Sequence, residues 1–318
     1  MRRGVARESR LSQEAIRIGF IGAGLMGHGA AKNIMERGNY PLTTMAHRNR
    51  APIEDLLSRG ASEAKSPAEI AAKSDVVFLC LPGSEEVKET IYGTDGLLDA
   101  LRAGMVVVDL TTTFPSVSIE IGKDLEERDV AFLDAPLGRS PKEAEAGKLG
   151  CFVGGPDQVI DRVEPILNCF AENVVRTGAL GSGGTCKILN NFITLGNCAV
   201  IAEAVATGVR LGIDQKIFHQ VVSASGANSR MFQQVMPWVM EGDSSFLQGH
   251  LRTAMKDVTF YDALSKEANA TSFLGSTIFE IYRYANNKGY GGSFVPLLCG
   301  IMAEINGDVI HPLNADQQ

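Results

Sequence analysis

A glycine-rich turn near the start of the chain constrains the fold more than any other feature. Residues 18–27 read IGFIGAGLMG, so the three glycines of a G-x-G-x-x-G pattern directly follow an apolar run. Gly22 allows a tight turn, Gly24 lets the backbone approach a pyrophosphate, and Gly27 lets a helix pack closely on a strand. A helix that begins there points its N-terminal N–H groups at the phosphate charge. Because the turn follows a strand pattern and opens a helix pattern, it predicts dinucleotide binding.

Short β-rich runs alternate with helical patterns through the first half of the chain. We expect strands at Ile16–Ile21, Leu42–Ala46, Val76–Leu81, Met105–Asp109 and Val130–Leu133, and helices at Leu25–Arg37 and Pro115–Arg128. Ser66, Pro67 and Glu69 form a capping-box pattern with proline at the first helical position, which marks another helix start. This alternation predicts an α/β Rossmann domain, with a doubly wound, mostly parallel sheet covered by helices on both faces.

Beyond about residue 180 the strand pattern stops. Helical patterns follow at Gly183–Leu211, Gln215–Ala224, Phe232–Met240, Leu251–Ala268 and Ser276–Asn287. A chain of 318 residues suits two domains, so we expect a Rossmann domain over residues 16–179 and an all-α domain over 180–318. Residues 1–15 carry four arginines without a continuous apolar core. We interpret them as a disordered tail, with an organellar presequence as the alternative.

Composition and charge exclude several classes of partner. The net charge of −7 argues against nucleic acid or an anionic membrane as the main partner. The long apolar stretch Ile188–Ile213 contains Asn190, Asn191, Asn197, Glu203 and Arg210, which predicts a buried helix rather than a membrane span. Six scattered cysteines without a CxxC pair predict reduced thiols in a cytoplasmic protein that has no metal centre.

The loop after the second expected strand bears on the choice of dinucleotide. NAD-binding versions of this fold carry an acid about 20 residues after the turn, but that position here is His47, followed by Arg48 and Arg50. These arginines could pair with a 2′-phosphate, which favours NADP, with NAD as the alternative. A solvated basic loop is the competing interpretation. The predicted cofactor contacts in the turn and this loop are Gly22, Gly24, Leu25, Met26, Gly27, His47 and Arg48.

Several separated blocks resemble one known family. They are Gly22–Gly27, Leu81-Pro82, Val108–Thr112, Asp134-Ala135-Pro136, Gly181–Asn191 and Lys256-Asp257. In this order they resemble the β-hydroxyacid dehydrogenases, the group of 3-hydroxyisobutyrate dehydrogenase, over nearly the whole chain. The resemblance implies a 6-phosphogluconate dehydrogenase-like fold. It also implies that Leu81, Thr112 and Lys256 contact the cofactor, although Leu81 and Thr112 could be strand-end packing and Lys256 part of a surface ion-pair face.

The same resemblance implies that Lys187 is the catalytic lysine and Asn191 its partner. Asn191 follows Lys187 at i+4, on the same face of the expected helix. Hydride transfer to an aldehyde leaves a developing alkoxide, which needs a proton donor within hydrogen-bond reach, and an ammonium has three donors. The competing interpretation is that Lys187 caps the helix while Asn191 satisfies buried backbone. We also expect Asn191 and Thr194 to contact the substrate.

One segment departs from the family pattern. After Asp134-Ala135-Pro136 the family shows Ser-Gly-Gly, whereas this chain continues Leu137-Gly138-Arg139-Ser140. This version resembles the sulfolactaldehyde reductase branch. We expect Gly138 and Arg139 to bind the acid group of the substrate, because a guanidinium offers a rigid fork of donors to an oxyanion. The alternative is that Arg139 pairs with Glu143 or Glu145.

These observations predict an NAD(P)-dependent β-hydroxyacid dehydrogenase that acts on a short acidic aldehyde or its hydroxy acid. The alternatives are a non-catalytic NADP-binding protein and an imine reductase of the same fold, and the presence of Lys187 argues against both. Because the stretch Ile188–Ile213 is apolar nearly all round, it suits burial inside a domain or between subunits. We therefore expect a homodimer or homotetramer.

Overall fold

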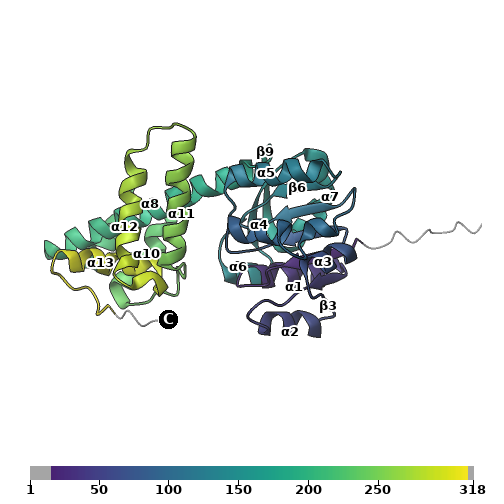
Figure 1. The fold of residues 1–318 in the computed structure, drawn as a ribbon. Helices are drawn as coiled ribbons and strands as arrows, with labels where there is room; N and C mark the ends of the chain where they lie inside the picture. Colours follow the sequence, from purple (N-terminus) through teal and green to yellow (C-terminus); the bar gives the residue numbers. More distant parts are fainter. Residues whose placement is uncertain (1–15, 314–318) are drawn as a thin grey trace, which may run out of the picture. The chain divides into compact units, whose positions relative to one another are not determined.

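The computed structural model of the chain describes residues 16–313. They divide into two compact units, one ending at Gly184 and the other beginning at Thr185. Figure 1 shows that the first unit contains the sheet and the second is helical.

The sheet of the first unit has the strand order of a dinucleotide-binding fold. Its strands are β1 (Ile18–Ile21), β2 (Leu42–Thr44), β3 (Ser62–Glu63), β4 (Val76–Leu79), β5 (Val106–Asp109), β6 (Ala131–Asp134), β7 (Leu137–Gly138), β8 (Leu149–Gly154) and β9 (Ala171–Gly178). The order β3-β2-β1-β4-β5-β6 is parallel throughout, as in Rossmann folds. β8 runs antiparallel to β6 and β7 and parallel to β9. The predicted doubly wound, mostly parallel sheet is confirmed.

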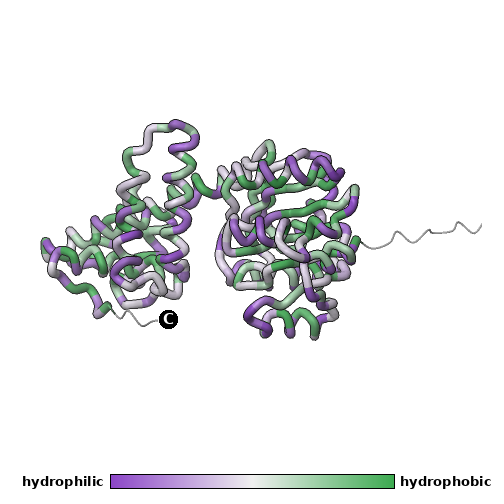
Figure 2. Tube along the Cα trace, viewed as in Figure 1, coloured by the Kyte–Doolittle hydropathy of each residue, from purple (hydrophilic) through white to green (hydrophobic). Residues whose placement is uncertain are grey.

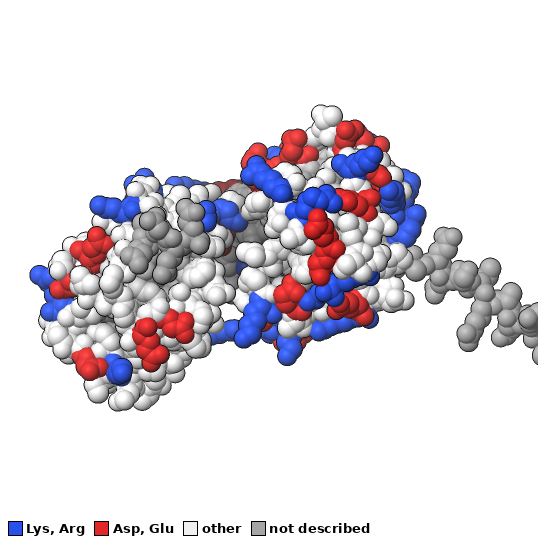
Figure 3. All heavy atoms as spheres, turned by 90° about the horizontal axis from the view of Figure 1, so that it is seen from below, with Lys and Arg blue, Asp and Glu red and all other residues white. Residues whose placement is uncertain are grey.

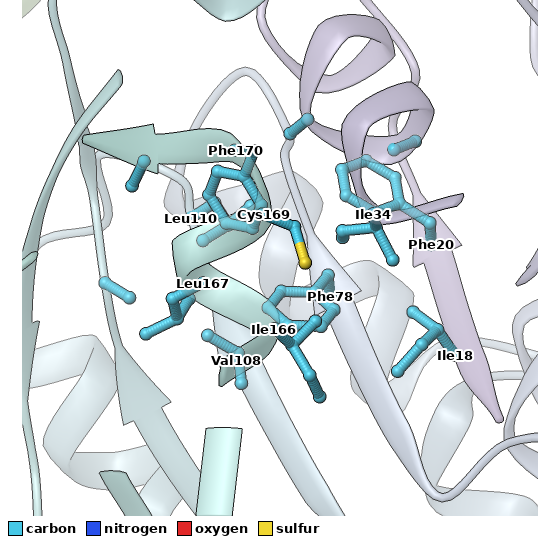
Figure 4. Close-up of a cluster of buried hydrophobic side chains, with 14 of the residues drawn as sticks. Ile18, Phe20, Ile34, Phe78, Val108, Leu110, Ile166, Leu167, Cys169 and Phe170 are labelled. Atoms are coloured by element: carbon cyan, nitrogen blue, oxygen red, sulfur yellow. The ribbon is translucent and has the colours of Figure 1, made fainter. Parts of the chain in front are cut away.

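Helices cover both faces of this sheet because successive strand residues point to opposite faces. The helices are α1 (Gly27–Gly38), α2 (Ala51–Ser58), α3 (Pro67–Lys73), α4 (Ser84–Tyr92), α5 (Pro115–Glu126), α6 (Pro141–Glu145) and α7 (Asp157–Phe170). One face packs on α1 and α7 and buries Ile18, Phe20, Phe78, Val108, Ile34, Ile166 and Phe170 (Figure 4). The other packs on α3, α4 and α5 and buries Val77, Leu79, Val107, Ile70, Ile91 and Ile121. Figure 2 shows hydrophobic stretches, in green, where the trace runs through the sheet of this unit.

The predicted capping box at the start of α3 is half formed. The Ser66 side chain accepts a hydrogen bond from the Glu69 backbone N–H. The Glu69 carboxylate accepts from the Lys65 backbone N–H instead of that of Ser66, and it also binds the Lys73 ammonium one turn on. A complete capping box, which the sequence analysis did not predict, opens α6 at Ser140 and Glu143.

The second unit is a bundle around one long helix. Its helices are α8 (Ser182–Arg210), whose first three residues belong to the first unit, α9 (Gln215–Ser223), α10 (Arg230–Glu241), α11 (Leu251–Glu267), α12 (Phe273–Asn287) and α13 (Leu298–Ile305). α8 buries Leu195, Cys198, Ala202 and Val205 in the core of this unit. The hydroxyl of fully buried Tyr282 on α12 donates to the Leu195 carbonyl at 3.0 Å. By length and composition α8 could cross a membrane, a test that buried core helices also pass.

Charged side chains of both signs are interspersed on the surface. Figure 3 shows Lys and Arg next to Asp and Glu on the visible face. Ion pairs on the surface include Arg59 with Asp55 and Arg176 with Asp161. The net charge of −7 is therefore not gathered into one acidic patch on that face.

Candidate active site

The three glycines of the turn after β1 have different surroundings. Gly22 has φ +101°, and a Cβ there would lie 2.2 Å from the Cys80 carbonyl oxygen. A Cβ on Gly27 would lie 2.0 Å from the Gly22 carbonyl oxygen, so close packing of α1 on the turn also requires glycine. A Cβ on exposed Gly24 would meet nothing within 4 Å. Gly22 and Gly27 thus form the turn, and Gly24 borders open space.

This arrangement fits the pyrophosphate of a dinucleotide. The open side of Gly24 lies at the N-terminus of α1, whose first turn contains no acidic residue and whose N-cap residue, Met26, makes no side-chain cap. A helix N-terminus attracts a phosphate through its N–H groups and its dipole. Leu25 is 74% exposed beside it. Gly22, Gly24, Leu25, Met26 and Gly27 therefore lie together as one turn with room for a ligand.

The loop after β2 separates the two arginines that the sequence predicts for a 2′-phosphate. Arg50 donates to both carboxylate oxygens of Glu63 on β3, at 3.0 and 3.2 Å. Arg48 and its neighbour His47 are exposed, and within residues 16–313 Arg48 has no hydrogen-bond or ion-pair partner. Arg50 is therefore already paired with Glu63, whereas Arg48 is the guanidinium with open donors among the described residues; that either binds a 2′-phosphate stays a prediction.

A second group of loops follows β4 and β5. Leu81 donates its backbone N–H to the Thr111 hydroxyl at 3.0 Å, which ties the two loops together. Asp109, fully buried at the end of β5, accepts from the Thr111 N–H at 2.9 Å and the Thr113 hydroxyl at 2.5 Å. Burial raises the pKa of the Asp109 carboxyl to about 6. The structure therefore brings Leu81 close to the loop that carries Thr112, at the carboxyl end of the parallel strands, where open α/β sheets bind ligands.

Arg139 follows β7 with φ +77° and is engaged within the first unit. Its guanidinium donates to the Glu172 carboxylate and to the Lys148 carbonyl, both at 2.6 Å. The alternative partners, Glu143 and Glu145, are used elsewhere: Glu143 caps α6, and Glu145 binds His28 and Lys32. A substrate acid group would have to compete with Glu172. The geometry thus favours a structural role for Arg139 next to buried Gly138, with a partner that the sequence analysis did not name.

The second unit holds the predicted catalytic pair and a third residue that the sequence analysis did not select. On α8, Lys187 and Asn191 are half-buried, and Thr194 follows on the same helix. The Asn191 amide donates to the carboxylate of Asp257 on α11 at 2.8 Å. The Lys256 ammonium lies 3.5 Å from the other Asp257 oxygen, Oδ1, which is buried without a hydrogen bond. The competing interpretation of Lys256 was a surface ion-pair face: Lys256 does pair with Asp257, but Asp257 also binds Asn191 on α8, and the predicted contact of Lys256 with the cofactor stays a prediction.

Burial and charge act in opposite directions on this cluster. Burial lowers the pKa of the Lys187 ammonium below its usual value, with Asp257 opposing the shift and Lys256 adding to it. Burial likewise raises the pKa of Asp257, against the attraction of both lysines. Lys256 also lies 5.5 Å from the centre of the Phe260 ring. Because its pKa is lowered, the half-buried Lys187 ammonium gives up a proton more readily than a solvated lysine does, as a general acid must.

No metal chemistry is indicated in residues 16–313. Among them, no group of three His, Cys, Asp or Glu side chains is placed to hold a metal ion. The chemistry that the described residues offer is phosphate binding in the first unit and proton transfer in the second.

Comparison with known proteins gives a family match for each part of the chain. Residues 17–178 match the NAD binding domain of 6-phosphogluconate dehydrogenase. Residues 181–294 match the NAD-binding domain of NADP-dependent 3-hydroxyisobutyrate dehydrogenase. The mitochondrial 3-hydroxyisobutyrate dehydrogenase of Mus musculus is 33% identical over 279 residues, which cover 86% of this chain and 83% of that protein. The chain belongs to the β-hydroxyacid dehydrogenase family.

Two further relatives extend this result. The 2-(hydroxymethyl)glutarate dehydrogenase of Eubacterium barkeri is 28% identical over 93% of this chain and 97% of its own length. The crystal structure of a 3-hydroxyisobutyrate dehydrogenase from Salmonella typhimurium is 27% identical, with a TM-score of 0.78 over 90% of this chain and 99% of that one. This β-hydroxyacid dehydrogenase is an NAD(P)-dependent oxidoreductase that acts on CH–OH groups.

Proposed function

We propose that this dehydrogenase reduces a short aldehyde bearing an acid group to the corresponding hydroxy acid, and catalyses the reverse oxidation, with NADP as its preferred cofactor. The observation that carries the proposal is the cluster of Lys187, Asn191 and Asp257. It places an ammonium of lowered pKa and an amide, backed by one carboxylate, within a single unit. A general acid of this kind typically contributes about 10²–10⁴-fold to a rate.

The bound nicotinamide cofactor supplies the hydride for reduction and accepts it in oxidation. In the reduction, the substrate oxygen gains negative charge as its carbon gains hydride. Lys187 donates a proton to that oxygen, and in the oxidation it takes the proton back. Asp257 favours the charged form of Lys187 and so opposes the effect of burial. Because Asp257 accepts the Asn191 side-chain N–H, it orients the amide. The Asn191 side-chain oxygen accepts from the Asn190 amide at 3.5 Å and has a second lone pair for the substrate hydroxyl or for Lys187.

The preference for NADP rests on the loop after β2. No acid follows the turn where NAD-binding folds place one, and exposed Arg48 has open donors. A 2′-phosphate offers this guanidinium charge-assisted hydrogen bonds that a ribose hydroxyl cannot match. The acid at β3, Glu63, is already bound by Arg50, which reduces its capacity to bind a ribose hydroxyl.

The substrate class is inferred from the relatives and from one departure in sequence. The relatives are named for activity on small hydroxy acids, 3-hydroxyisobutyrate and 2-(hydroxymethyl)glutarate. The Gly138-Arg139 segment resembles the sulfolactaldehyde reductase branch, so sulfolactaldehyde is included among the candidates. We also propose that the chain is cytoplasmic and assembles as a homodimer or homotetramer.

A cofactor and substrate panel tests the proposal. Oxidation of NADPH and NADH is followed at 340 nm with methylmalonate semialdehyde, succinic semialdehyde, sulfolactaldehyde and a cyclic imine. We expect an acidic aldehyde to be the fastest substrate, with NADPH, and Lys187→Ala to lose at least about 100-fold in kcat while the Kd of NADPH stays within about threefold. Faster reduction of the imine, or a Lys187→Ala variant within about tenfold of the wild type, would contradict the proposal.

A further inference from the structure

The N-terminus of α8, the helix that carries Lys187, is bound by Asp134, a residue outside that helix. Asp134 ends β6, is 2% exposed, and extends its carboxylate to the start of α8. One oxygen accepts the Gly181 backbone N–H at 2.8 Å, and the other accepts the Gly184 backbone N–H at 2.6 Å. The first N–H groups of an α-helix have no partner within the helix. Asp134 supplies that partner and places a negative charge where the helix dipole favours one.

The glycines around residue 184 allow this close approach. A Cβ on Gly183 would lie 2.3 Å from the Phe152 carbonyl oxygen and 2.9 Å from the Asp134 carboxylate. A Cβ on Gly154, which pairs with Asp134 in the sheet, would lie 2.4 Å from the same carboxylate. Because only glycine fits at these positions, the strands and the first turn of α8 are packed backbone to backbone around Asp134.

The same turn contacts the loop of Thr112, which is predicted to contact the cofactor. A Cβ on Gly184 would lie 3.0 Å from the Thr113 carbonyl oxygen. Thr113 in turn donates its hydroxyl to Asp109, next to Thr112. Asp134 therefore fixes the first turn of α8 against the cofactor loop, entirely within the first unit.

Lys187 follows Gly184 by three residues on the same uninterrupted helix. A residue in a continuous helix has its position and direction set by the preceding turn, since each residue adds about 1.5 Å of rise and a fixed rotation. We propose that Asp134 is a positioning residue for the reaction: its carboxylate fixes the first turn of α8, from which the same helix continues to Lys187. This inference rests on the proposed role of Lys187.

Two substitutions disturb the turn in different ways. Asp134→Asn keeps the shape of the side chain but turns one acceptor into an amide donor that faces a backbone N–H. Gly184→Ala keeps the carboxylate but brings a Cβ against the Thr113 carbonyl, a backbone group that cannot swing aside. Gly196→Ala is the matched control on the same helix, since its Cβ would lie 3.1 Å from Cδ1 of Ile278, the tip of a flexible side chain.

The assays are turnover of the fastest panel substrate, NADPH binding by fluorescence, and hydrogen exchange of the backbone amides of residues 184–190 in the full chain without cofactor. For Asp134→Asn and Gly184→Ala we expect kcat to fall at least about tenfold while the Kd of NADPH stays within about threefold. In both, exchange should be faster by at least about tenfold. Gly196→Ala should match the wild type in all three measurements.

The inference is overturned if Asp134→Asn, or Gly184→Ala should the first variant not fold, keeps both kcat and amide exchange within about twofold of the wild type. It is also overturned if kcat falls only in proportion to the folded fraction. Lys187→Ala is assayed in parallel. If Lys187→Ala is active, the proposed function is wrong. If Lys187→Ala is inactive while Asp134→Asn and Gly184→Ala are fully active, only the proposed role of Asp134 is wrong.

Discussion

Substitution of Arg48 tests how the loop after β2 selects the cofactor. We expect Arg48→Ala to weaken NADPH binding strongly and NADH binding little, and Arg50→Ala to leave NADPH binding nearly unchanged. Arg48 has open donors among the described residues, whereas the Arg50 guanidinium donates to the two Glu63 carboxylate oxygens at 3.0 and 3.2 Å. The two residues are two positions apart in one exposed loop, so each is a matched control for the other.

The magnitude follows from the contacts that would be lost. A charge-assisted hydrogen bond contributes about 1.5–3 kcal/mol, so loss of Arg48 should raise the Kd of NADPH by about 10- to 150-fold. NADH lacks the 2′-phosphate, and its Kd should change by less than about threefold. Arg50→Ala removes an exposed ion pair with Glu63, which contributes little to stability.

Titration of each variant with NADPH and NADH, followed by nicotinamide fluorescence, measures both dissociation constants. Thermal unfolding of the same samples shows that the variants are folded. A wild-type enzyme that binds NADH more tightly than NADPH would refute the reasoning from the missing acid. Equal losses in Arg48→Ala and Arg50→Ala would refute the assignment of the phosphate to Arg48 alone.

In Asp257→Asn, the fall of kcat for reduction at alkaline pH should occur at lower pH than in the wild type, because loss of the carboxylate removes the attraction that raises the pKa of Lys187. A pH profile of kcat checks this, and an unchanged profile would contradict it. Burial raises the pKa of Asp109 from 3.8 to about 6, so the folded chain binds this proton more tightly than the unfolded chain does. The free energy of unfolding should therefore fall by up to about 3 kcal/mol between about pH 4 and pH 7. Denaturant titrations of Asp109→Asn should lack that part of the pH dependence. A difference in unfolding free energy between this variant and the wild type that stays constant over this pH range would refute the prediction. Arg139→Ala should lower Tm and leave KM for acidic aldehydes within about threefold, because Glu172 already neutralises the guanidinium; a KM at least about tenfold higher would restore its predicted role in substrate binding.

Periodicity predicted the elements whose own pattern is strong. The expected strand at Met105–Asp109 is β5 (Val106–Asp109), and the expected helix at Gly183–Leu211 is α8 (Ser182–Arg210). β8 and β9 were not predicted. β9 is mostly exposed and does not alternate cleanly, and β8 carries Gly154, whose place is required by the approach of Asp134 rather than by local strand propensity. Tertiary contacts overrode local preference there.

The residues of the site were predictable where a motif contains them and not where distant partners meet. The turn at Gly22–Gly27 and the spacing of Lys187 and Asn191 can be recognised within a few residues. Asp257 meets Asn191 across 66 positions, and Arg139 meets Glu172 across 33. The partners that the sequence suggested were local: Lys256 for Asp257, and Glu143 or Glu145 for Arg139. Nothing in local spacing identifies the distant partners, because packing of separate elements creates these pairs.

The unequal surroundings of the three turn glycines have an evolutionary consequence. A Cβ added at Gly22 or at Gly27 would lie 2.2 or 2.0 Å from a backbone carbonyl oxygen, whereas Gly24 borders open space. Mutation of the first two is opposed by folding itself, and mutation of Gly24 is opposed only by the need to bind a cofactor. A descendant that gave up catalysis and kept the fold would therefore retain Gly22 and Gly27 while Gly24 drifted. Sequences that have lost Gly24 alone are where folded, cofactor-free relatives of this enzyme should be sought.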